Sequence, residues 1–127
     1  MNRAIADTSV FVAQESGREL GTVPELIAVS VITAAELELG VLRAEDESSR
    51  GRRLATLSRI RATFPLLEID PEIASCFARL ASKELGKGRK LRRHDTWIAA
   101  TALRHGASVL TQDEDFTSFS EVETIRV

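Results

Sequence analysis

The sequence lacks several features that would place it in a specialised class of protein. It has a single cysteine, Cys76, and therefore no intrachain disulfide; because this residue falls in a helical pattern, we expect a small buried apolar side chain. No apolar run approaches the roughly 20 residues that span a bilayer, and no apolar segment follows a basic start. We therefore expect no membrane anchor and no signal peptide. The cysteine content is compatible with a reducing cytosol, and a cytoplasmic protein is expected.

A strong charge of either sign is also missing. The formal net charge is -2 over 127 residues, which excludes a protein coated with basic residues for nucleic acid but still allows a local basic patch. Internal repeats, low-complexity tracts and linkers are absent from the sequence. Hydrophobic residues make up 43% and charged residues 28%, as in ordinary globular proteins. We expect residues 1–127 to form one domain.

Short apolar segments alternate with stretches of helical periodicity along most of the chain. Strands are predicted over residues 3–7, 27–30, 66–69 and 108–111, and a last edge strand within residues 121–127. Helices are predicted over residues 10–15, 33–44, 49–62 and 96–105, and another opens at Pro71. Short helical turns are predicted at residues 24–26 and 113–119, and charged loops at residues 45–53 and 85–94. Strands that alternate with helices indicate parallel βα units, so the predicted fold class is an α/β sandwich.

Capping residues support several of the predicted helix boundaries. Thr8 or Ser9 is expected to cap the first helix. Thr33 and Glu36 have the spacing of a capping box, in which the two side chains bond to each other's backbone N–H groups. Gly106 is expected to end the helix over residues 96–105. The helix that opens at Pro71 has one apolar face, made by Ile73, Phe77, Leu80 and Ala81.

Four acidic residues fall where predicted strands end or predicted helices begin. Asp7 ends the first strand, and Asp113 comes just after the fourth. Glu36 lies near the start of the helix that follows the second strand, and Asp95 begins a later helix. Open parallel sheets bind ligands beyond the carboxyl ends of their strands. If the first and fourth strands are neighbours, Asp7 and Asp113 lie within metal-bridging distance of each other.

Each of these acids alone has a simple structural explanation. Asp7, Asp95 and Asp113 can be helix caps or first-turn acids favoured by the helix dipole, and Glu36 can belong to a capping box. Together, however, four carboxylates on one rim of a sheet repel one another unless a cation relieves the repulsion. A carboxylate set without histidine or cysteine favours Mg²⁺ or Mn²⁺ over Zn²⁺. Such sites carry out phosphoryl chemistry.

Four stretches that contain these acids carry a resemblance to a known family. They are Ile5-Ala6-Asp7-Thr8-Ser9, Thr33-Ala34-Ala35-Glu36-Leu37-Glu38-Leu39-Gly40, His94-Asp95-Thr96-Trp97-Ile98-Ala99-Ala100 and Thr111-Gln112-Asp113-Glu114-Asp115-Phe116. In this order and spacing they resemble the successive motifs of PIN-domain ribonucleases. The Glu-Leu-x-x-Gly and Asp-x-x-Ile-Ala-Ala patterns are most similar to VapC-type toxins of prokaryotic toxin–antitoxin pairs.

The resemblance implies a fold, an activity and partners. The implied fold is a PIN-like three-layer sandwich with a central, mainly parallel sheet flanked by helices. The implied activity is endonucleolytic cleavage of RNA that depends on Mg²⁺ or Mn²⁺. The implied partners are the RNA substrate, a cognate antitoxin that silences the enzyme, and a second copy of the chain in a homodimer, with no membrane involved.

The resemblance also implies roles for particular residues. The catalytic acids would be Asp7, Glu36, Asp95 and Asp113. Of these, Asp7, Asp95 and Asp113 would hold the metal, with Asp115 and Glu36 as further candidates through water. The hydroxyls of Thr8 and Thr111 would steady the acids or the phosphate. Gln112 departs from the Arg or Asn that relatives often carry at its position, so no substrate contact is carried over to it.

A basic segment leads directly into Asp95. Residues 83–93 carry six cations and one acid. Charge runs of this kind are often solvated, flexible loops. The functional alternative is an arm that contacts RNA phosphates and releases counterions on binding, through Arg89, Lys90, Arg92 and Arg93. No aromatic residues interrupt the segment, so base stacking is not predicted there.

Three other functions compete with a nuclease. A phosphoacceptor receiver domain needs a lysine after a late strand, but the lysines here all lie in the basic segment. A haloacid-dehalogenase-like phosphatase needs Asp-x-Asp after the first strand, where Ser9 occupies the second acidic position. A catalytically silent PIN-like module that binds RNA or protein is the remaining alternative. Intact acids at all four positions favour the enzyme.

Overall fold

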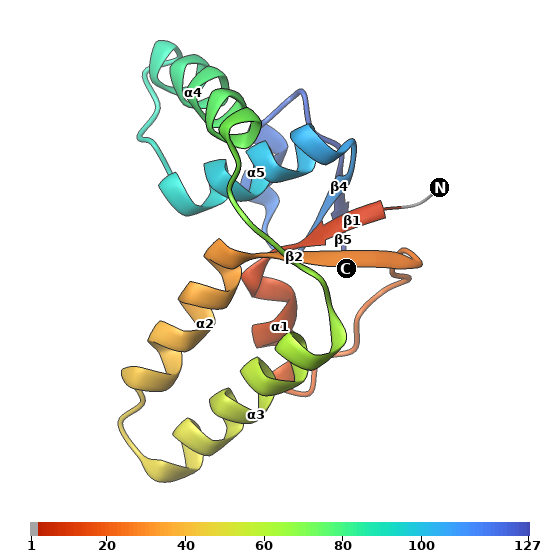
Figure 1. Ribbon diagram of the computed structural model, residues 1–127, viewed down its shortest axis with the longest axis vertical. Helices are drawn as coiled ribbons and strands as arrows, with labels where there is room; N and C mark the ends of the chain where they lie inside the picture. Colours follow the sequence, from red (N-terminus) through yellow and green to blue (C-terminus); the bar gives the residue numbers. More distant parts are fainter. Residues whose placement is uncertain (1–2) are drawn as a thin grey trace.

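A five-stranded sheet forms the centre of the protein, described here over residues 3–127 by a computed structural model (Figure 1). Its strands are β1 (Arg3–Ala6), β2 (Leu26–Ser30), β3 (Leu66–Leu67), β4 (Ser108–Thr111) and β5 (Thr124–Arg126). All described pairings are parallel, and the strand order is β3-β2-β1-β4-β5. The predicted neighbourhood of the first and fourth strands is therefore confirmed, because Ile5 pairs with Val109.

Helices cover both faces of this sheet, as the predicted fold class requires. The helices are α1 (Thr8–Glu15), α2 (Val31–Leu42), α3 (Glu47–Thr63), α4 (Pro71–Gly86) and α5 (Arg93–His105), with a short 3-10 helix η1 (Glu114–Ser118). In Figure 1, α4 and α5 lie on one side of the sheet, and α1, α2 and α3 lie on the other. Helices α2 and α3 form a hairpin that projects away from the sheet.

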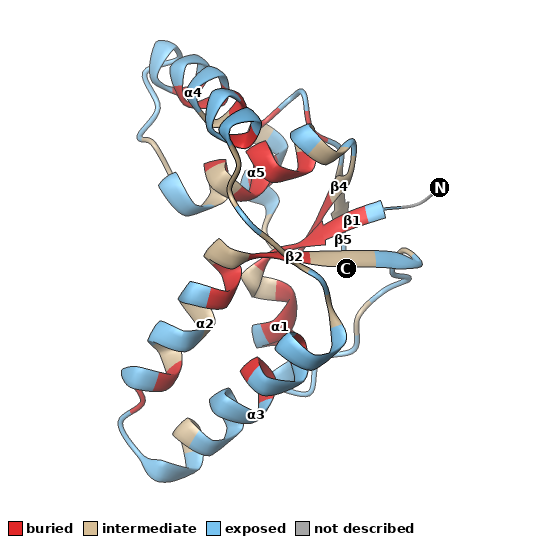
Figure 2. Ribbon diagram, viewed as in Figure 1, coloured by how far each residue is buried: buried red, intermediate tan, exposed pale blue. Residues whose placement is uncertain are grey.

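The alternation of side chains along β1 divides the core into two layers. Ile5 points into a cluster that it shares with residues of α4 and α5, including Ile73 and Ile98. Its neighbours Ala4 and Ala6 point into the other cluster, together with residues of α1 and α3. The buried stripes of the helices face the sheet, while the outer faces of α2 and α3 are largely exposed (Figure 2). Both faces of β1 are therefore buried, as is usual in a parallel sheet.

Helices α4 and α5 follow the sequence prediction closely. Asp70 caps α4 through a 2.7 Å bond from the backbone N–H of Ile73, and Pro71 occupies the first turn. Of the predicted apolar face, Ile73, Leu80 and Ala81 are buried in the core. Phe77 is partly buried and stacks on Trp97 of α5, with ring centroids 3.9 Å apart. Gly106 ends α5 with a φ of 61°, a left-handed conformation that glycine adopts without strain.

Several predicted boundaries are wrong, and competing caps explain two of them. Helix α2 begins after Ser30, whose hydroxyl accepts a bond from the backbone N–H of Ile32; Thr33 and Glu36 therefore do not form a capping box. Helix α1 is capped by Asp7 rather than by Thr8 or Ser9.

Other differences concern predicted loops and turns. The stretch 45–53 is not a loop, because Asp46 caps α3 and the helix begins at Glu47. Residues 24–26 form no helical turn, and β2 begins at Leu26. The basic loop is shorter than predicted, because α4 continues to Gly86 and α5 begins at Arg93.

None of the helices between residues 3 and 127 has both the length and the apolar character needed to cross a membrane.

Candidate active site

Asp7 lies at the carboxyl end of β1 and is held by hydroxyl groups. Its side chain is buried, with the residue 6% exposed, and it caps α1. The hydroxyl of Ser9 donates a 2.7 Å bond to Oδ2 of Asp7, and the hydroxyl of Thr111 donates a 3.0 Å bond to the same oxygen. Thr111 ends β4, so the pairing of β1 with β4 brings these residues together. The same carboxylate therefore caps α1 and forms part of the candidate site.

The backbone after β4 is tied to the same hydroxyls. The N–H of Gln112 donates to Oγ of Ser9 at 3.0 Å, and the N–H of Asp113 donates to Oγ1 of Thr111 at 2.9 Å. Asp113 in turn caps η1 by accepting a 2.8 Å bond from the backbone N–H of Asp115. This network fixes Asp113 relative to Asp7.

Glu36 takes no part in capping α2, and its carboxylate instead contacts residues of the candidate site. Its Oε1 accepts a 2.8 Å bond from the hydroxyl of Thr8, and its Oε2 lies 3.2 Å from Nδ1 of His94. Glu36 thus joins the start of α1 to the start of α5. The structural explanation considered for this acid, a capping box with Thr33, does not apply.

Asp95 lies in the first turn of α5 and is paired with Arg92. Nη1 of Arg92 donates a 2.8 Å bond to Oδ2 of Asp95. The same guanidinium donates to the backbone carbonyl of Asp115 at 2.7 Å and to the hydroxyl of Ser118 at 2.9 Å, and it lies over the ring of Phe119. Arg92 therefore fastens the start of α5 to η1.

The electrostatics of Asp95 show that the four predicted acids converge. Burial, followed by the negative charge of Asp7, raises the pKa of Asp95 to about 6 from 3.8. Asp113 and Glu36 raise this pKa further, while Arg92 lowers it. Carboxylates influence one another in this way only at short range. The sequence prediction that these acids share one end of the sheet thus agrees with the structure.

The acids do not close around a common point as their side chains stand. Between residues 3 and 127, no three aspartate, glutamate, histidine or cysteine side chains are arranged to hold an ion. Hydroxyls hold Asp7, and Arg92 supplies positive charge to Asp95. Asp115, the fifth acid of the motifs, has a side chain that is 69% exposed and lies 3.8 Å from Arg92. It therefore sits at the margin of the acid group.

Several cations of the basic segment form ion pairs within the protein, unlike those of a fully solvated loop. Lys83 pairs with Glu121, outside the acid site. Lys87 and Arg89 each lie 3.7 Å from the carboxylate of Glu84, which is buried. The predicted RNA-binding cations Arg89, Lys90 and Arg93 are exposed, whereas Arg92 is engaged with Asp95.

Sequence reasoning missed some of the partners that hold the acids. Ser9 is expected from the sequence as a cap or as a hydroxyl that supports the acids, and the structure shows the second arrangement, with its hydroxyl bonded to Asp7. Arg92 was read only as an RNA contact, although its i,i+3 spacing from Asp95 is that of an ion pair on a helix. His94 and Glu36 are 58 residues apart in the chain, and no local sequence pattern predicts their contact.

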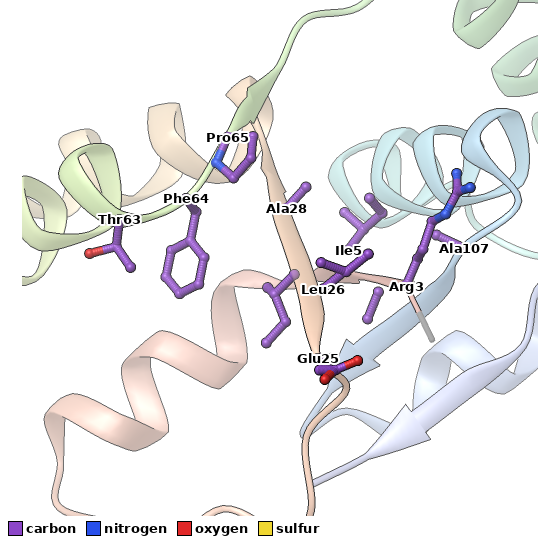
Figure 3. Close-up of a pocket in the computed structure, with 11 residues that line it drawn as sticks. Arg3, Ile5, Glu25, Leu26, Ala28, Thr63, Phe64, Pro65 and Ala107 are labelled. Carbon is purple, nitrogen blue, oxygen red and sulfur yellow. The ribbon is translucent and has the colours of Figure 1, made fainter. Parts of the chain in front are cut away.

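The two ends of the sheet each have a hollow beside them, and the two hollows differ in the chemistry of their linings. A polar hollow of about 440 Å³ adjoins the acids and is lined by Glu36, His94 and Asp95 among others. The hollow in Figure 3, of about 450 Å³, lies at the amino ends of β1 and β2 and is largely apolar, with Leu26, Ala28 and Phe64 around it. It gathers no acid cluster, so the chemistry belongs to the carboxyl ends of the strands.

Comparisons with known proteins agree with this fold and identify its family. Residues 4–122 match the PIN domain family. The chain is 43% identical to ribonuclease VapC5 of Mycobacterium tuberculosis over 97% of its length and 94% of the relative's. It is 39% identical to ribonuclease VapC4 of the same organism, over 100% of its length and 98% of the relative's. A crystal structure of VapBC-5 from M. tuberculosis superposes with a TM-score of 0.89 at 39% identity and covers 100% of both chains. The chain therefore belongs to the PIN domain family, in the branch that contains the VapC ribonucleases.

Proposed function

We propose that this protein is a metal-dependent endoribonuclease that acts as the toxin of a toxin–antitoxin pair. The observation that carries the proposal is the convergence of Asp7, Glu36 and Asp113 on Asp95, in a chain of the PIN family. The relatives VapC5 and VapC4 are named ribonucleases, which supports RNA as the substrate. The silent-module alternative leaves the mutual repulsion of these acids without a purpose.

The donor chemistry of the acid group suits a hard divalent cation, although no three of these side chains within residues 3–127 are arranged around an ion as they stand. Its donors are carboxylate oxygens, which Mg²⁺ and Mn²⁺ prefer. Burial first, and then repulsion by Asp7, raises the pKa of Asp95, and a cation would relieve the repulsion. Asp7, Asp95 and Asp113 would hold the ion, with Glu36 and Asp115 acting through water. When bound, Mg²⁺ or Mn²⁺ polarises the phosphate and lowers the pKa of a bound water.

The protein's own residues prepare the site for phosphodiester cleavage. Ser9 and Thr111 fix the carboxylate of Asp7, and Thr8 fixes that of Glu36. Glu36 or Asp113 would position the attacking water or take its proton. Attack in line with the leaving oxygen then yields a 5′-phosphate. This assignment gives each converging acid a place around the scissile bond.

RNA would reach the acids along the basic segment. Arg89, Lys90 and Arg93 are exposed near the start of α5, and they would contact phosphates by counterion release. Arg92 differs from them, because its guanidinium already neutralises Asp95 and holds η1. We assign it to the acid site as well as to RNA binding.

Protein partners complete the proposal. The structure of VapBC-5 is described as a member of a family of toxin–antitoxin systems, and on this basis we propose a cognate antitoxin for this chain. The helical hairpin of α2 and α3 carries exposed leucines, with Leu39 and Leu42 57% and 70% exposed. Such apolar side chains suit a protein interface, either with the antitoxin or within a homodimer. We propose a cytoplasmic location, where RNA and an antitoxin are both accessible.

One experiment separates the enzyme from the silent module. The purified protein is incubated with RNA in Mg²⁺ or Mn²⁺, and then with EDTA. The proposal expects fragments with 5′-phosphates in the presence of the ion and none in EDTA. The Asp7→Asn variant, prepared in parallel, excludes a contaminating nuclease. Binding of RNA without any ion-dependent cleavage contradicts the proposal and favours the module.

A further inference from the structure

A second polar hollow opens beside the acid site, and some of the cations proposed to contact RNA line it. It has a volume of about 610 Å³ and lies between the carboxyl end of α4, the loop after it and η1. Its lining combines three cations and three acids: Arg89, Lys90, Arg92, Glu84, Glu114 and Asp115. Because Arg92 also contacts Asp95 at 2.8 Å, the hollow adjoins the acids. Its size falls in the range of ordinary ligand sites.

Glu84 is the unusual residue of this hollow. Its side chain is only 6% exposed, yet within residues 3–127 no hydrogen bond reaches its carboxylate. The nearest cations are Lys87 and Arg89, each 3.7 Å away, which is longer than a hydrogen bond. Glu84 is therefore ion-paired with Lys87 and Arg89 but not hydrogen-bonded to them, and its carboxylate lines a hollow next to the acids.

We propose that this hollow binds one unstacked guanine base of the RNA, with Glu84 reading its Watson–Crick edge. This inference rests on the proposed function. Guanine carries two neighbouring donors, N1–H and the N2 amino group, which match the two oxygens of a carboxylate. Its O6 acceptor lies beside them, where Arg89, 3.7 Å from the Glu84 carboxylate, supplies a donor. The lining thus offers two acceptors next to a cation, in the pattern that guanine requires.

The other bases fit this lining less well. Adenine and cytosine offer one amino donor beside a ring nitrogen that is itself an acceptor and would face the carboxylate. Uracil offers one N–H between two carbonyl acceptors. Each leaves part of the Glu84 carboxylate unpaired or repelled, and a mismatch of this kind discriminates strongly. Lys90 and Arg92 lie in the same lining and would hold the flanking phosphate. The guanine would therefore occupy a fixed position close to the cut.

The first test uses the wild-type protein and needs no variant. Short single-stranded RNAs, each with guanine at one position near the cut, are compared with copies in which that guanine is adenine, cytosine, uracil or inosine. Binding is measured in EDTA by fluorescence anisotropy, and cleavage is measured with Mn²⁺. We expect one position at which replacement of guanine by adenine weakens binding by at least about fivefold. Inosine lacks the N2 amino group, so RNA with inosine at this position should bind with an affinity between those of the guanine and adenine RNAs. Equal binding of all bases at every position overturns the inference.

The second test uses Glu84→Gln, with Glu72→Gln at the other end of α4 as a matched control. By charge alone, loss of the Glu84 carboxylate strengthens the binding of every RNA equally. The inference instead expects Glu84→Gln to lose the guanine preference while it still cleaves RNA, and Glu72→Gln to keep the preference. Thermal melts confirm that both variants are folded. A guanine preference retained by folded Glu84→Gln overturns the assignment. A wild-type protein that cuts RNA without base preference overturns this inference alone, whereas one that cuts no RNA overturns the proposed function.

Discussion

The hydroxyl of Thr111 donates a 3.0 Å hydrogen bond to Oδ2 of Asp7 from 104 residues away in the chain. The bond exists because β1 and β4 are neighbours, with Ala6 opposite Leu110 immediately before the two residues. It holds one oxygen of Asp7 in place and so orients the whole carboxylate. A residue that caps a helix is thereby also fixed as a candidate metal ligand.

Replacement of Asp7 by asparagine is expected to abolish cleavage and preserve the fold. Asparagine keeps an acceptor for Thr111 and Ser9 but loses the charge that a cation needs. The rate of RNA cleavage should fall by more than about a hundredfold. This is the largest loss that is usual when only a residue orienting a metal ligand is replaced, and a ligand itself should cost more. The melting temperature should stay constant or rise, because a repelling charge is removed. Asp46→Asn, at the exposed cap of α3, is the matched control and should cut normally. Wild-type cleavage by Asp7→Asn contradicts the assignment.

Asp95 predicts a specific pH dependence of stability. Its pKa is raised from 3.8 to about 6, chiefly by burial and then by Asp7. The folded state therefore binds a proton more tightly than the unfolded state. Stability from this group is fully present below about pH 4 and is lost as pH rises through 6. The ionised side chain, about a quarter exposed, lowers the free energy of unfolding by on the order of 2 kcal/mol.

The Asp95→Asn variant tests this linkage. Above pH 7 it should be more stable than the wild type, by an amount reduced by the lost pairing with Arg92. The difference should shrink as the pH falls toward 4, where the wild-type side chain is neutral. Urea unfolding in EDTA at pH 4.5 and 7.5 measures both values. A stability difference that is constant across this range contradicts the pKa assignment.

Divalent ions are expected to stabilise the folded protein. At pH 7.5, Mn²⁺ at about 100 times its dissociation constant should add about 2.7 kcal/mol, seen as a rise of several degrees in melting temperature. The rise should be smaller at pH 5, because protons compete with the ion for Asp95. Differential scanning fluorimetry with and without EDTA gives the measurement. Asp7→Asn should show little of the effect, and an equal rise in that variant places the ion elsewhere.

The basic segment predicts a salt-dependent contact with RNA. Lys90→Gln and Arg93→Gln should each weaken binding of all sequences and reduce the slope of log affinity against log salt by about 0.7. Anisotropy titrations at several salt concentrations in EDTA measure this slope. Arg59→Gln, an exposed position on α3, is the control. Unchanged slopes in the first two variants identify a solvated loop with no RNA contact. Arg92 is unsuitable for this test, since its loss also frees Asp95.

Much of the fold and the four acids are predictable from local patterns. The strand over residues 108–111 is found at its predicted bounds, and Gly106 ends α5 as expected. The acids stand out because each adjoins a strand end or helix start, and parallel strands bring their carboxyl ends to one edge. The start of α2 was misplaced because Ser30 outcompetes Thr33 as a cap, which no periodicity reveals.

The partners of the acids are less predictable, since they depend on packing between distant elements. His94 meets Glu36 only because α5 and α2 approach each other across the edge of the sheet. Arg92 has several candidate partners in the sequence, and its choice of Asp95, Asp115 and Ser118 follows from the position of η1. The buried state of Glu84 likewise depends on how the loop after α4 folds back over it.

The strand order has a consequence for when the enzyme becomes active. A ribosome makes β1 first and β4 nearly last, so a growing chain carries Asp7 long before Thr111 exists to hold it. Asp113 follows later still. A nascent chain therefore has no complete acid site until synthesis has passed residue 113 and β4 has docked beside β1. A protein proposed to cut RNA therefore gains its acid site only after nearly all of its chain has been made.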